Sequence, residues 1–242
     1  MAECRRARGS RCSSNSEKRK AFWEKVAVMN MEYFISIIIG YLLGCLSPSA
    51  LISKMKHKNL RQSGTGNLGA TNVMLNFGKA LGALVMVFDI CKAFFAVRLA
   101  EYLFPEIALA GMLAGLFAVI GHVFPFYMKF KGGKGLASFG GMVLAYNSLL
   151  FLVLLLSGGV LMLIVNYSFI LPFYAASVFP VFVAIHSKNV LLTVICAAAS
   201  VLIMVKHAGN IKKAKDGTDN KIRDFLKRHS HDEEEEPEKC NK

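Results

Sequence analysis

The fold is decided by residues 136–206, whose sequence is LASFGGMVLAYNSLLFLVLLLSGGVLMLIVNYSFILPFYAASVFPVFVAIHSKNVLLTVICAAASVLIMVK. Lys188 is the only charged residue between the ends of this stretch. Because about 20 apolar residues cross the hydrocarbon core of a bilayer as a helix, the stretch could hold three long helices or four shorter ones. Polar breaks near residues 146–147, 166–167 and 186–188 favour four.

Three further apolar runs precede this stretch and complete the bundle. They cover Tyr33–Ile52, Ala80–Leu103 and Ile107–Phe124. Over all 242 residues, hydrophobic residues make up 54% and charged residues 19%, and the mean hydropathy is +0.44. This composition excludes a disordered chain, a disulfide-stapled secreted domain and a soluble α/β enzyme. We expect an all-α, polytopic integral membrane protein, a bundle of seven transmembrane helices.

Basic residues predict the orientation of the bundle. If the basic segments at residues 54–79, 129–134 and 206–227 all lie in the cytoplasm, the chain makes an odd number of crossings from an N-terminus outside. Seven crossings satisfy this condition and six do not. The sequence therefore predicts an N-terminus outside and a C-terminus in the cytoplasm.

The two ends of the chain differ in composition from the bundle. Residues 1–28 hold eight Lys or Arg, which the positive-inside rule would keep in the cytoplasm, against the predicted orientation. A start at Met29 or Met31 would remove this conflict. We expect a disordered basic extension over residues 1–30, a membrane domain over residues 31–228, and an acidic, solvated tail over residues 229–242.

The net charge and the cysteines have ordinary explanations. The net charge is +13, but Lys and Arg lie next to membrane spans, where cytoplasmic anchoring accounts for them. Nucleic-acid binding is therefore not expected. The six cysteines include no C-x-x-C pair, so the sequence predicts neither a redox framework nor a metal site.

A first polar segment of interest covers residues 61–73, RQSGTGNLGATNV. Its glycines, Gly64, Gly66 and Gly69, alternate with Ser, Thr and Asn. Backbone N–H groups of such a segment can converge on an anion, and the short side chains add donors. Composition alone leaves a phosphate-binding loop and a structural glycine turn as two open interpretations.

A second segment lies between two spans at residues 121–135, GHVFPFYMKFKGGKG. Lys131 and Lys134 flank two glycines, which would let a ligand approach the backbone closely. The segment does not match G-x-x-x-x-G-K-[ST] and no strand precedes it, so it does not predict a nucleotide site. Its lysines could instead anchor to anionic lipid headgroups.

A third segment covers residues 206–213, KHAGNIKK, and Asp219 follows it. If the last helix continues here, His207 and Asn210 lie on one face and can point at a common ligand. A structural role for a lone interfacial histidine is the alternative. Within the second span, Asp89 and Lys92 are also one turn apart, and the cost of a charge in lipid predicts that they pair inside the bundle.

Several familiar catalytic patterns are absent from the sequence. There is no His-Cys cluster with metal-ligand spacing and no G-x-S-x-G nucleophile elbow. No histidine is followed five residues later by aspartate, the acid–base pattern of many coenzyme-A-dependent glycerolipid acyltransferases; Tyr127 follows His122 at that spacing.

Taken together, the three segments resemble the three cytoplasmic motifs of the bacterial PlsY-type glycerol-3-phosphate acyltransferases. The resemblance rests on SGTGNLGATNV at residues 63–73, on Gly121-His122 with FKGGKG at residues 130–135, and on His207-x-x-Asn210-Ile211. Phe88-Asp89-x-x-Lys92 also fits, and the resemblance covers roughly residues 33–222.

This resemblance implies a seven-helix enzyme of the bacterial plasma membrane with its active site facing the cytoplasm. The implied reaction moves an acyl group from acyl phosphate to the 1-hydroxyl of glycerol 3-phosphate and gives lysophosphatidic acid and phosphate, the first step of phospholipid biosynthesis. No metal, coenzyme A or other cofactor is implied. Beyond the two substrates, the implied partners are membrane lipid and the enzyme that produces acyl phosphate.

The motifs also imply roles for individual residues. The catalytic residues would be Thr65, Lys134, His207 and Asn210. The substrate-binding residues would be the other motif positions: Gly64, Gly66, Asn67, Gly69, Thr71, Asn72, His122, Lys131, Gly132, Gly133, Gly135 and Asp219. A substrate phosphate oxygen would accept the hydroxyl proton, with His207 as the alternative base.

Three positions depart from the family pattern. Thr65 stands where the family usually has Ser, Asp219 where it has Glu, and Leu75 where it has Arg. Leucine cannot bind a phosphate. A weak or inactive paralogue that binds phospholipid precursors is therefore an alternative function. An anion transporter is another, although we find no inverted repeats or broken mid-membrane helices of the kind typical of transporters.

Overall fold

The computed structural model describes residues 23, 26 and 28–216, and this part of the chain is all-α. Most of the extension expected over residues 1–30 lies outside the described residues, as do Asp219 and the whole acidic tail. After a first helix over residues 28–45, the elements are α2 (Pro48–Met55), α3 (Ala70–Phe77), α4 (Lys79–Leu103), α5 (Ala110–Val123), the 3₁₀ helix η1 (Phe126–Met128), α6 (Leu136–Tyr146), α7 (Ser148–Val165), α8 (Ile170–Ser187) and α9 (Val190–Lys215).

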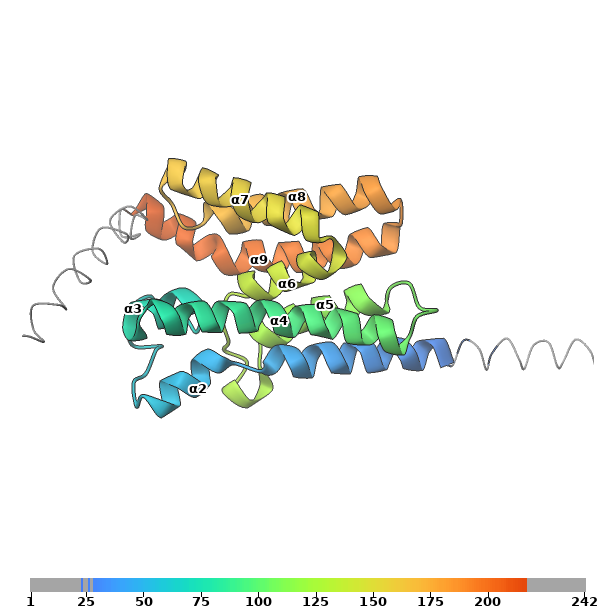
Figure 1. Cartoon of the computed structure of the whole chain (residues 1–242), viewed down its shortest axis with the longest axis horizontal. Helices are drawn as coiled ribbons and strands as arrows, with labels where there is room; N and C mark the ends of the chain where they lie inside the picture. Colours follow the sequence, from blue (N-terminus) through green and yellow to red (C-terminus); the bar gives the residue numbers. More distant parts are fainter. Residues whose placement is uncertain (1–22, 24–25, 27, 217–242) are drawn as a thin grey trace, which may run out of the picture.

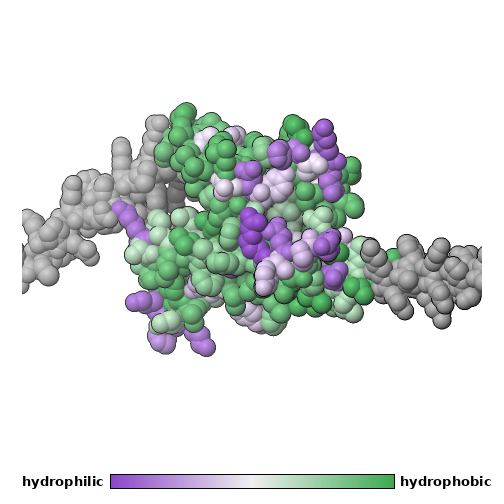
Figure 2. Space-filling model, turned by 45° about the vertical axis from the view of Figure 1, so that its right-hand side comes forward, coloured by the Kyte–Doolittle hydropathy of each residue, from purple (hydrophilic) through white to green (hydrophobic). Residues whose placement is uncertain are grey.

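The described chain holds six helical segments that are long and apolar enough to cross a membrane. They are Val28–Met55, Lys79–Leu103, Ala110–Met128, Ser148–Val165, Ile170–Ser187 and Val190–Lys215. Many of their Leu, Val and Ile side chains are exposed, and Figure 2 shows hydrophobic side chains over most of the visible helical surface. The protein is therefore a multi-pass integral membrane protein.

The stretch over residues 136–206 forms four helices, with ends where the sequence predicted breaks. The side chain of Asn147 accepts a hydrogen bond from the Leu150 N–H (2.8 Å) and caps α7. Asn166 and Lys188 adopt left-handed conformations, with φ of 65° and 53°, and end α7 and α8. However, α6 has only 11 residues. It extends about 17 Å at 1.5 Å per residue, against a hydrocarbon core of about 30 Å.

The first span differs from the single helix predicted over residues 33–52. The helix stops at Leu46 and Ser47, and the short helix α2 begins at Pro48. Pro48 has no N–H to continue the hydrogen-bond ladder, and the Ser47 side chain accepts from the Ala50 N–H (3.4 Å) instead. The chain therefore turns here, and Figure 1 shows α2 leaving the axis of the first helix.

The first helix packs on α5 through small residues. A Cβ added to Gly40 would lie 2.2 Å from the Ala114 carbonyl oxygen, and one added to Gly44 would lie 2.2 Å from the Ala118 carbonyl oxygen. Such close backbone approach is typical of membrane helices that associate through small residues. The main core forms farther along the chain around the edge-to-face pair Phe139 and Phe179 (5.6 Å between ring centroids).

The elements place the three sequence motifs toward one end of the bundle. Figure 1 shows α2, α3 and the C-terminal end of α9 at this end, with the connection between α5 and α6 turned toward it. We call it the motif end. The turn between α4 and α5 and the turn between α8 and α9 lie at the opposite end, which we call the far end.

Candidate active site

A cavity of about 430 Å³ at the motif end is lined by all three motifs. The motif positions that line it are Gly64, Thr65, Asn67, Gly69 and Thr71 from the first motif, His122, Lys134 and Gly135 from the second, and His207, Asn210 and Lys213 from the third. Segments far apart in the sequence therefore contribute to one concave site.

The first motif is a glycine loop held in place by Asn72 at the start of α3. The Asn72 side chain is buried; its Oδ1 accepts from the Thr65 N–H (2.8 Å) and its Nδ2 donates to the Leu60 carbonyl (2.7 Å). Gly64 and Gly66 have positive φ of 57° and 73°, a conformation that side chains disfavour. Asn72 therefore shapes the loop from beneath rather than lining the cavity.

The second motif contacts the first at Gly133. A Cβ added to Gly133 would lie 2.3 Å from His122 Nε2 and 2.8 Å from the Leu68 carbonyl oxygen, so only glycine fits between them. The Gly133 N–H donates to the His122 carbonyl (3.2 Å). The Arg61 guanidinium also donates to the Lys131 carbonyl, while the Lys131 side chain is exposed and does not line the cavity.

The third motif lies on the continuous helix α9, which brings His207, Asn210 and Lys213 to the cavity at three-residue spacing. Lys134 Nζ donates a hydrogen bond to Asn210 Oδ1 and so links the second and third motifs. His207 is buried, and its Nδ1 lies 2.9 Å from the Ile203 carbonyl oxygen. A carbonyl can only accept, so Nδ1 carries a proton, and in the neutral ring Nε2 is then an acceptor.

A buried charged cluster borders the cavity on α4 and α5. Lys92 Nζ lies 2.7 Å from Asp89 Oδ1, which confirms the predicted pair, and 2.9 Å from His122 Nδ1. Asp89 and His122 both line the cavity. No group of three His, Cys, Asp or Glu side chains in the described part of the chain is arranged to hold a metal ion.

An apolar arm extends the cavity between helices α4, α6, α7 and α8. Its lining residues are Met86, Ile90, Leu136, Phe139, Val143, Phe151, Leu154, Leu155, Leu171 and Ala175. The cavity thus has a polar end with two lysines and two histidines and a long apolar continuation. This shape can hold a charged headgroup together with a hydrocarbon chain.

Most of the site residues expected from the sequence line this cavity. Those that do not are Gly66, Asn72, Lys131, Gly132 and Gly133, which lie in or under the surrounding loops, and Asp219, which is outside the described residues. Leu75 lies in α3 and does not line the cavity either. The sequence reasoning did not single out Lys213, although its spacing from Asn210 could have indicated it. The apolar arm gave no sequence signal.

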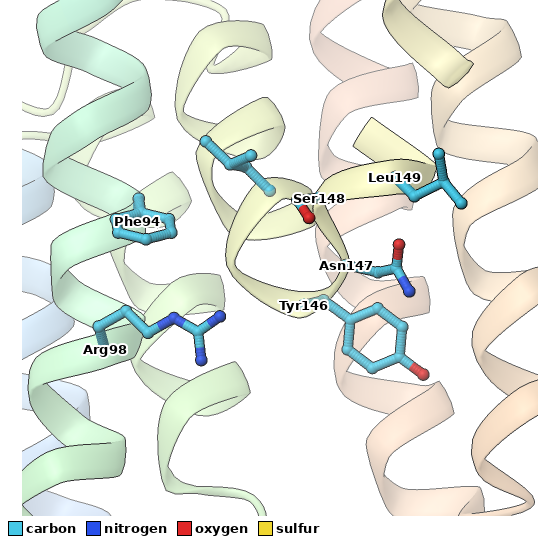
Figure 3. Close-up of a pocket in the computed structure, with 7 residues that line it drawn as sticks. Phe94, Arg98, Tyr146, Asn147, Ser148 and Leu149 are labelled. Carbon is cyan, nitrogen blue, oxygen red and sulfur yellow. The ribbon is translucent and has the colours of Figure 1, made fainter. Parts of the chain in front are cut away.

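A larger hollow of about 680 Å³ lies at the turn between α6 and α7, nearer the far end than the motif end (Figure 3). Its lining includes Phe94, Tyr146, Asn147 and Leu149, and its one charged lining residue is Arg98. The Arg98 guanidinium already donates to Glu101 (2.8 Å) and to the Ala145 carbonyl (2.8 Å). None of the three motifs contributes to this hollow, so the smaller cavity is the candidate active site.

Comparisons with known proteins agree with the site. Residues 34–217 match the family model described as glycerol-3-phosphate acyltransferase. The chain is 33% identical over 196 residues to a glycerol-3-phosphate acyltransferase of Lactiplantibacillus plantarum, covering 79% of this chain and 93% of the relative. It is 35% identical over 195 residues to one of Coxiella burnetii, covering 80% of this chain and 100% of the relative.

Two solved structures have the same fold. A crystal structure of PlsY, an integral membrane glycerol 3-phosphate acyltransferase, in its glycerol 3-phosphate form has a TM-score of 0.73 at 30% identity and covers 78% of this chain and 95% of that chain. The lysophosphatidic acid form has a TM-score of 0.72 at 28% identity, covering 80% and 96%. By its motifs, its fold and these relatives, the chain belongs to the glycerol-3-phosphate acyltransferase family.

Proposed function

We propose that the protein transfers an acyl group from acyl phosphate to the 1-hydroxyl of glycerol 3-phosphate and releases lysophosphatidic acid and phosphate, the first step of phospholipid biosynthesis. One observation carries the proposal: a single cavity joins a cationic, glycine-lined end to an apolar arm. The cationic end suits the phosphates of two phosphorylated substrates, and the apolar arm suits the fatty chain that one of them carries. The names of the two solved relatives, with glycerol 3-phosphate and with lysophosphatidic acid, support this acceptor and this product.

The polar end supplies the groups that phosphates need. Lys134 and Lys213 bring positive charge, and the Thr65 hydroxyl adds a donor. The backbone N–H groups of Thr65, Gly66 and Asn67 donate within the loop and fix its shape. Lys131 would contribute only from the rim, since its side chain is exposed. Holding both phosphates brings the glycerol hydroxyl close to the acyl carbon, so proximity and charge stabilisation accelerate the reaction.

The chemistry needs no protein nucleophile, because an acyl phosphate is already an activated mixed anhydride. The glycerol oxygen bonds to the acyl carbon, the bond between that carbon and the phosphate oxygen breaks, and phosphate leaves. A substrate phosphate oxygen accepts the hydroxyl proton, and His207 Nε2 is the alternative acceptor. Asn210 and Thr65 orient the reacting groups.

The acyl chain would lie in the apolar arm. The arm is partly open toward lipid, because Met86 and Leu155 line it and remain 44% and 46% exposed. A fatty chain could enter there directly from the bilayer. Membrane lipid would therefore be both the surroundings of the site and its route of supply, and the enzyme that makes acyl phosphate would deliver it at this membrane surface.

We further propose that α6 makes a seventh crossing, with the N-terminus outside and the active site facing the cytoplasm of a bacterial plasma membrane. The start of α6 adjoins Lys134 at the cavity, and its Ala145 carbonyl accepts from Arg98, near the far end of α4. The short helix therefore runs from the cavity toward the far end over about 17 Å. The basic loops at the motif end favour the cytoplasmic side.

A direct assay tests the proposed reaction. Purified protein is incubated with palmitoyl phosphate and labelled glycerol 3-phosphate, and labelled lysophosphatidic acid is the expected product. The second candidate, an inactive paralogue that binds phospholipid precursors, is favoured by Leu75 in place of the family arginine. No product from the natural sequence, with recovery in Leu75→Arg, would establish that candidate. Uptake of unchanged substrate into sealed proteoliposomes would favour transport.

A further inference from the structure

Two histidines line the same cavity, and each has one ring nitrogen engaged inside the protein. His122 comes from α5 and His207 from α9. In a neutral histidine one ring nitrogen donates and the other accepts, and the partner of one nitrogen fixes the role of the other. The partner of His122 Nδ1 is a lysine, which donates, and the partner of His207 Nδ1 is a carbonyl, which accepts.

Lys92 determines the state of His122. A charged lysine has three N–H donors and no acceptor. Lys92 Nζ has three contacts: Asp89 Oδ1 at 2.7 Å, the Leu46 carbonyl oxygen at 2.6 Å and His122 Nδ1 at 2.9 Å. The contact with Asp89 Oδ1 is an ion pair without hydrogen-bond geometry, whereas the other two contacts are hydrogen bonds. Because lysine can only donate, Nδ1 is the acceptor of its bond with Lys92.

The alternative state of His122 fits the cluster less well. A proton on Nδ1 could reach Asp89 Oδ1 across 3.3 Å. It would then face the nearer Lys92 ammonium at 2.9 Å, donor against donor, and the bond between these two side chains would be lost. Because Asp89 and Lys92 are each only 2% exposed, water cannot replace that lost bond.

We propose that the Asp89–Lys92 pair is a positioning device that fixes His122 as an Nε2–H donor toward the cavity, while His207 is fixed as an Nε2 acceptor. His122 Nε2 lies beside Gly133, and His122 is one of the residues that line the cavity. The two histidines thus have opposite tautomers. This inference rests on the proposed function for its ligand: the donor suits an anionic phosphoryl oxygen, and the acceptor suits a hydroxyl proton.

The first test reads the tautomers without substrate. In full-length protein labelled with ¹⁵N-histidine and reconstituted in lipid, the protonated and unprotonated ring nitrogens give separate resonances. Loss of a signal in His122→Gln or in His207→Gln assigns each residue. We expect neutral His122 with its proton on Nε2 and neutral His207 with its proton on Nδ1. A His122 protonated on Nδ1, alone or together with Nε2, overturns the inference.

The second test removes the pair without leaving a buried unpaired charge. Asp89→Leu combined with Lys92→Leu replaces both charges with apolar groups, a change that buried pairs often tolerate. The matched control is Arg98→Leu combined with Glu101→Leu, the other pair with the same spacing on α4. We expect the His122 signals to become a mixture of tautomers only in the Asp89→Leu, Lys92→Leu variant. In that variant kcat/KM should also fall about 10- to 100-fold.

A thermodynamic cycle separates positioning from general damage. In the His122→Gln background no tautomer remains to be fixed, so removing the pair should cost much less than it does with His122 present. An equal loss in both backgrounds, or an unchanged His122 tautomer after removal of the pair, overturns the inference. If the natural sequence makes no lysophosphatidic acid, the proposed function fails, and the resonances still decide the tautomers.

Discussion

Helix α4 carries two ion pairs with the same spacing in opposite surroundings. Asp89 and Lys92 are each 2% exposed and belong to a cluster beside the candidate active site. Arg98, which lines the hollow of Figure 3, and its partner Glu101 are 51% and 43% exposed. In the sequence, both pairs consist of an acidic and a basic residue three positions apart. The comparison shows that the position of a charge pair in the bundle, and not its pattern, determines what it does.

The largest expected difference between the two pairs is in stability. Lys92→Met leaves Asp89 as a buried, unpaired charge and should lower the free energy of unfolding by about 3–5 kcal/mol. Arg98→Met removes an exposed pair and should cost no more than about 1 kcal/mol. Thermal unfolding of the two variants in the same detergent measures both. Equal losses would mean that the burial of the first pair has no energetic consequence.

The next largest difference is expected between lysines at the two ends of the bundle. It should appear in turnover. Lys134→Ala removes a cation that lines the cavity and bonds to Asn210, so we expect kcat to fall about 10²- to 10³-fold with little change in unfolding temperature. Asn210→Ala should have a similar effect. The exposed Lys188 at the far end is the control, and its alanine variant should stay within about twofold of normal. Full activity of Lys134→Ala would remove the cavity from consideration as the active site.

Alanine substitution of one glycine at each end of the bundle gives a further comparison. Gly133→Ala places a methyl group against the Leu68 carbonyl and the His122 ring, which cannot easily move, and should cost about 1–3 kcal/mol as well as activity. Gly111→Ala meets Glu101 Cγ at 2.6 Å, but that side chain is half exposed and can swing away. Its cost should stay below about 1 kcal/mol. Chemical denaturation and the acyl-transfer assay measure both variants, and the reverse ranking would contradict the packing described here.

The smallest effect is expected in the hollow of Figure 3 itself. Leu149 lines that hollow and is 69% exposed, so Leu149→Ala should change stability by no more than about 0.5 kcal/mol and leave turnover unchanged. A strong loss of lysophosphatidic acid synthesis in this variant would assign the hollow a part in the reaction.

The sequence predicted the helix ends in the second half of the chain better than the turn within the first span. Asn147, Asn166 and Lys188 stop or start helices through local capping and left-handed turns, which short-range chemistry determines. The same chemistry was present at Ser47 and Pro48, but the surrounding apolar residues concealed it in a prediction based on hydropathy. The ends of α6 agree with the predicted start at residue 136 and the predicted break near residues 146–147.

The candidate site was predictable where polar residues stand out against apolar surroundings. The three motifs, and the pairing of Asp89 with Lys92, follow from the cost of exposing charge to lipid. The apolar arm could not be predicted, because Phe139, Phe151 and Leu154 lie in continuous apolar runs whose every face is hydrophobic. In such helices only the packing of neighbours decides which face borders a cavity.

The glycine face of the first helix determines the order in which the bundle can assemble. Its partner α5 leaves the ribosome only after α4. Until α5 is inserted, Gly40 and Gly44 therefore lack the Ala114 and Ala118 backbone that they contact in the folded protein. Membrane helices enter singly and associate afterwards. The glycine face can therefore dock on α5 only after the first helix has met α4 through Leu43 and Leu46, and a bulky residue at Gly40 would block this later step.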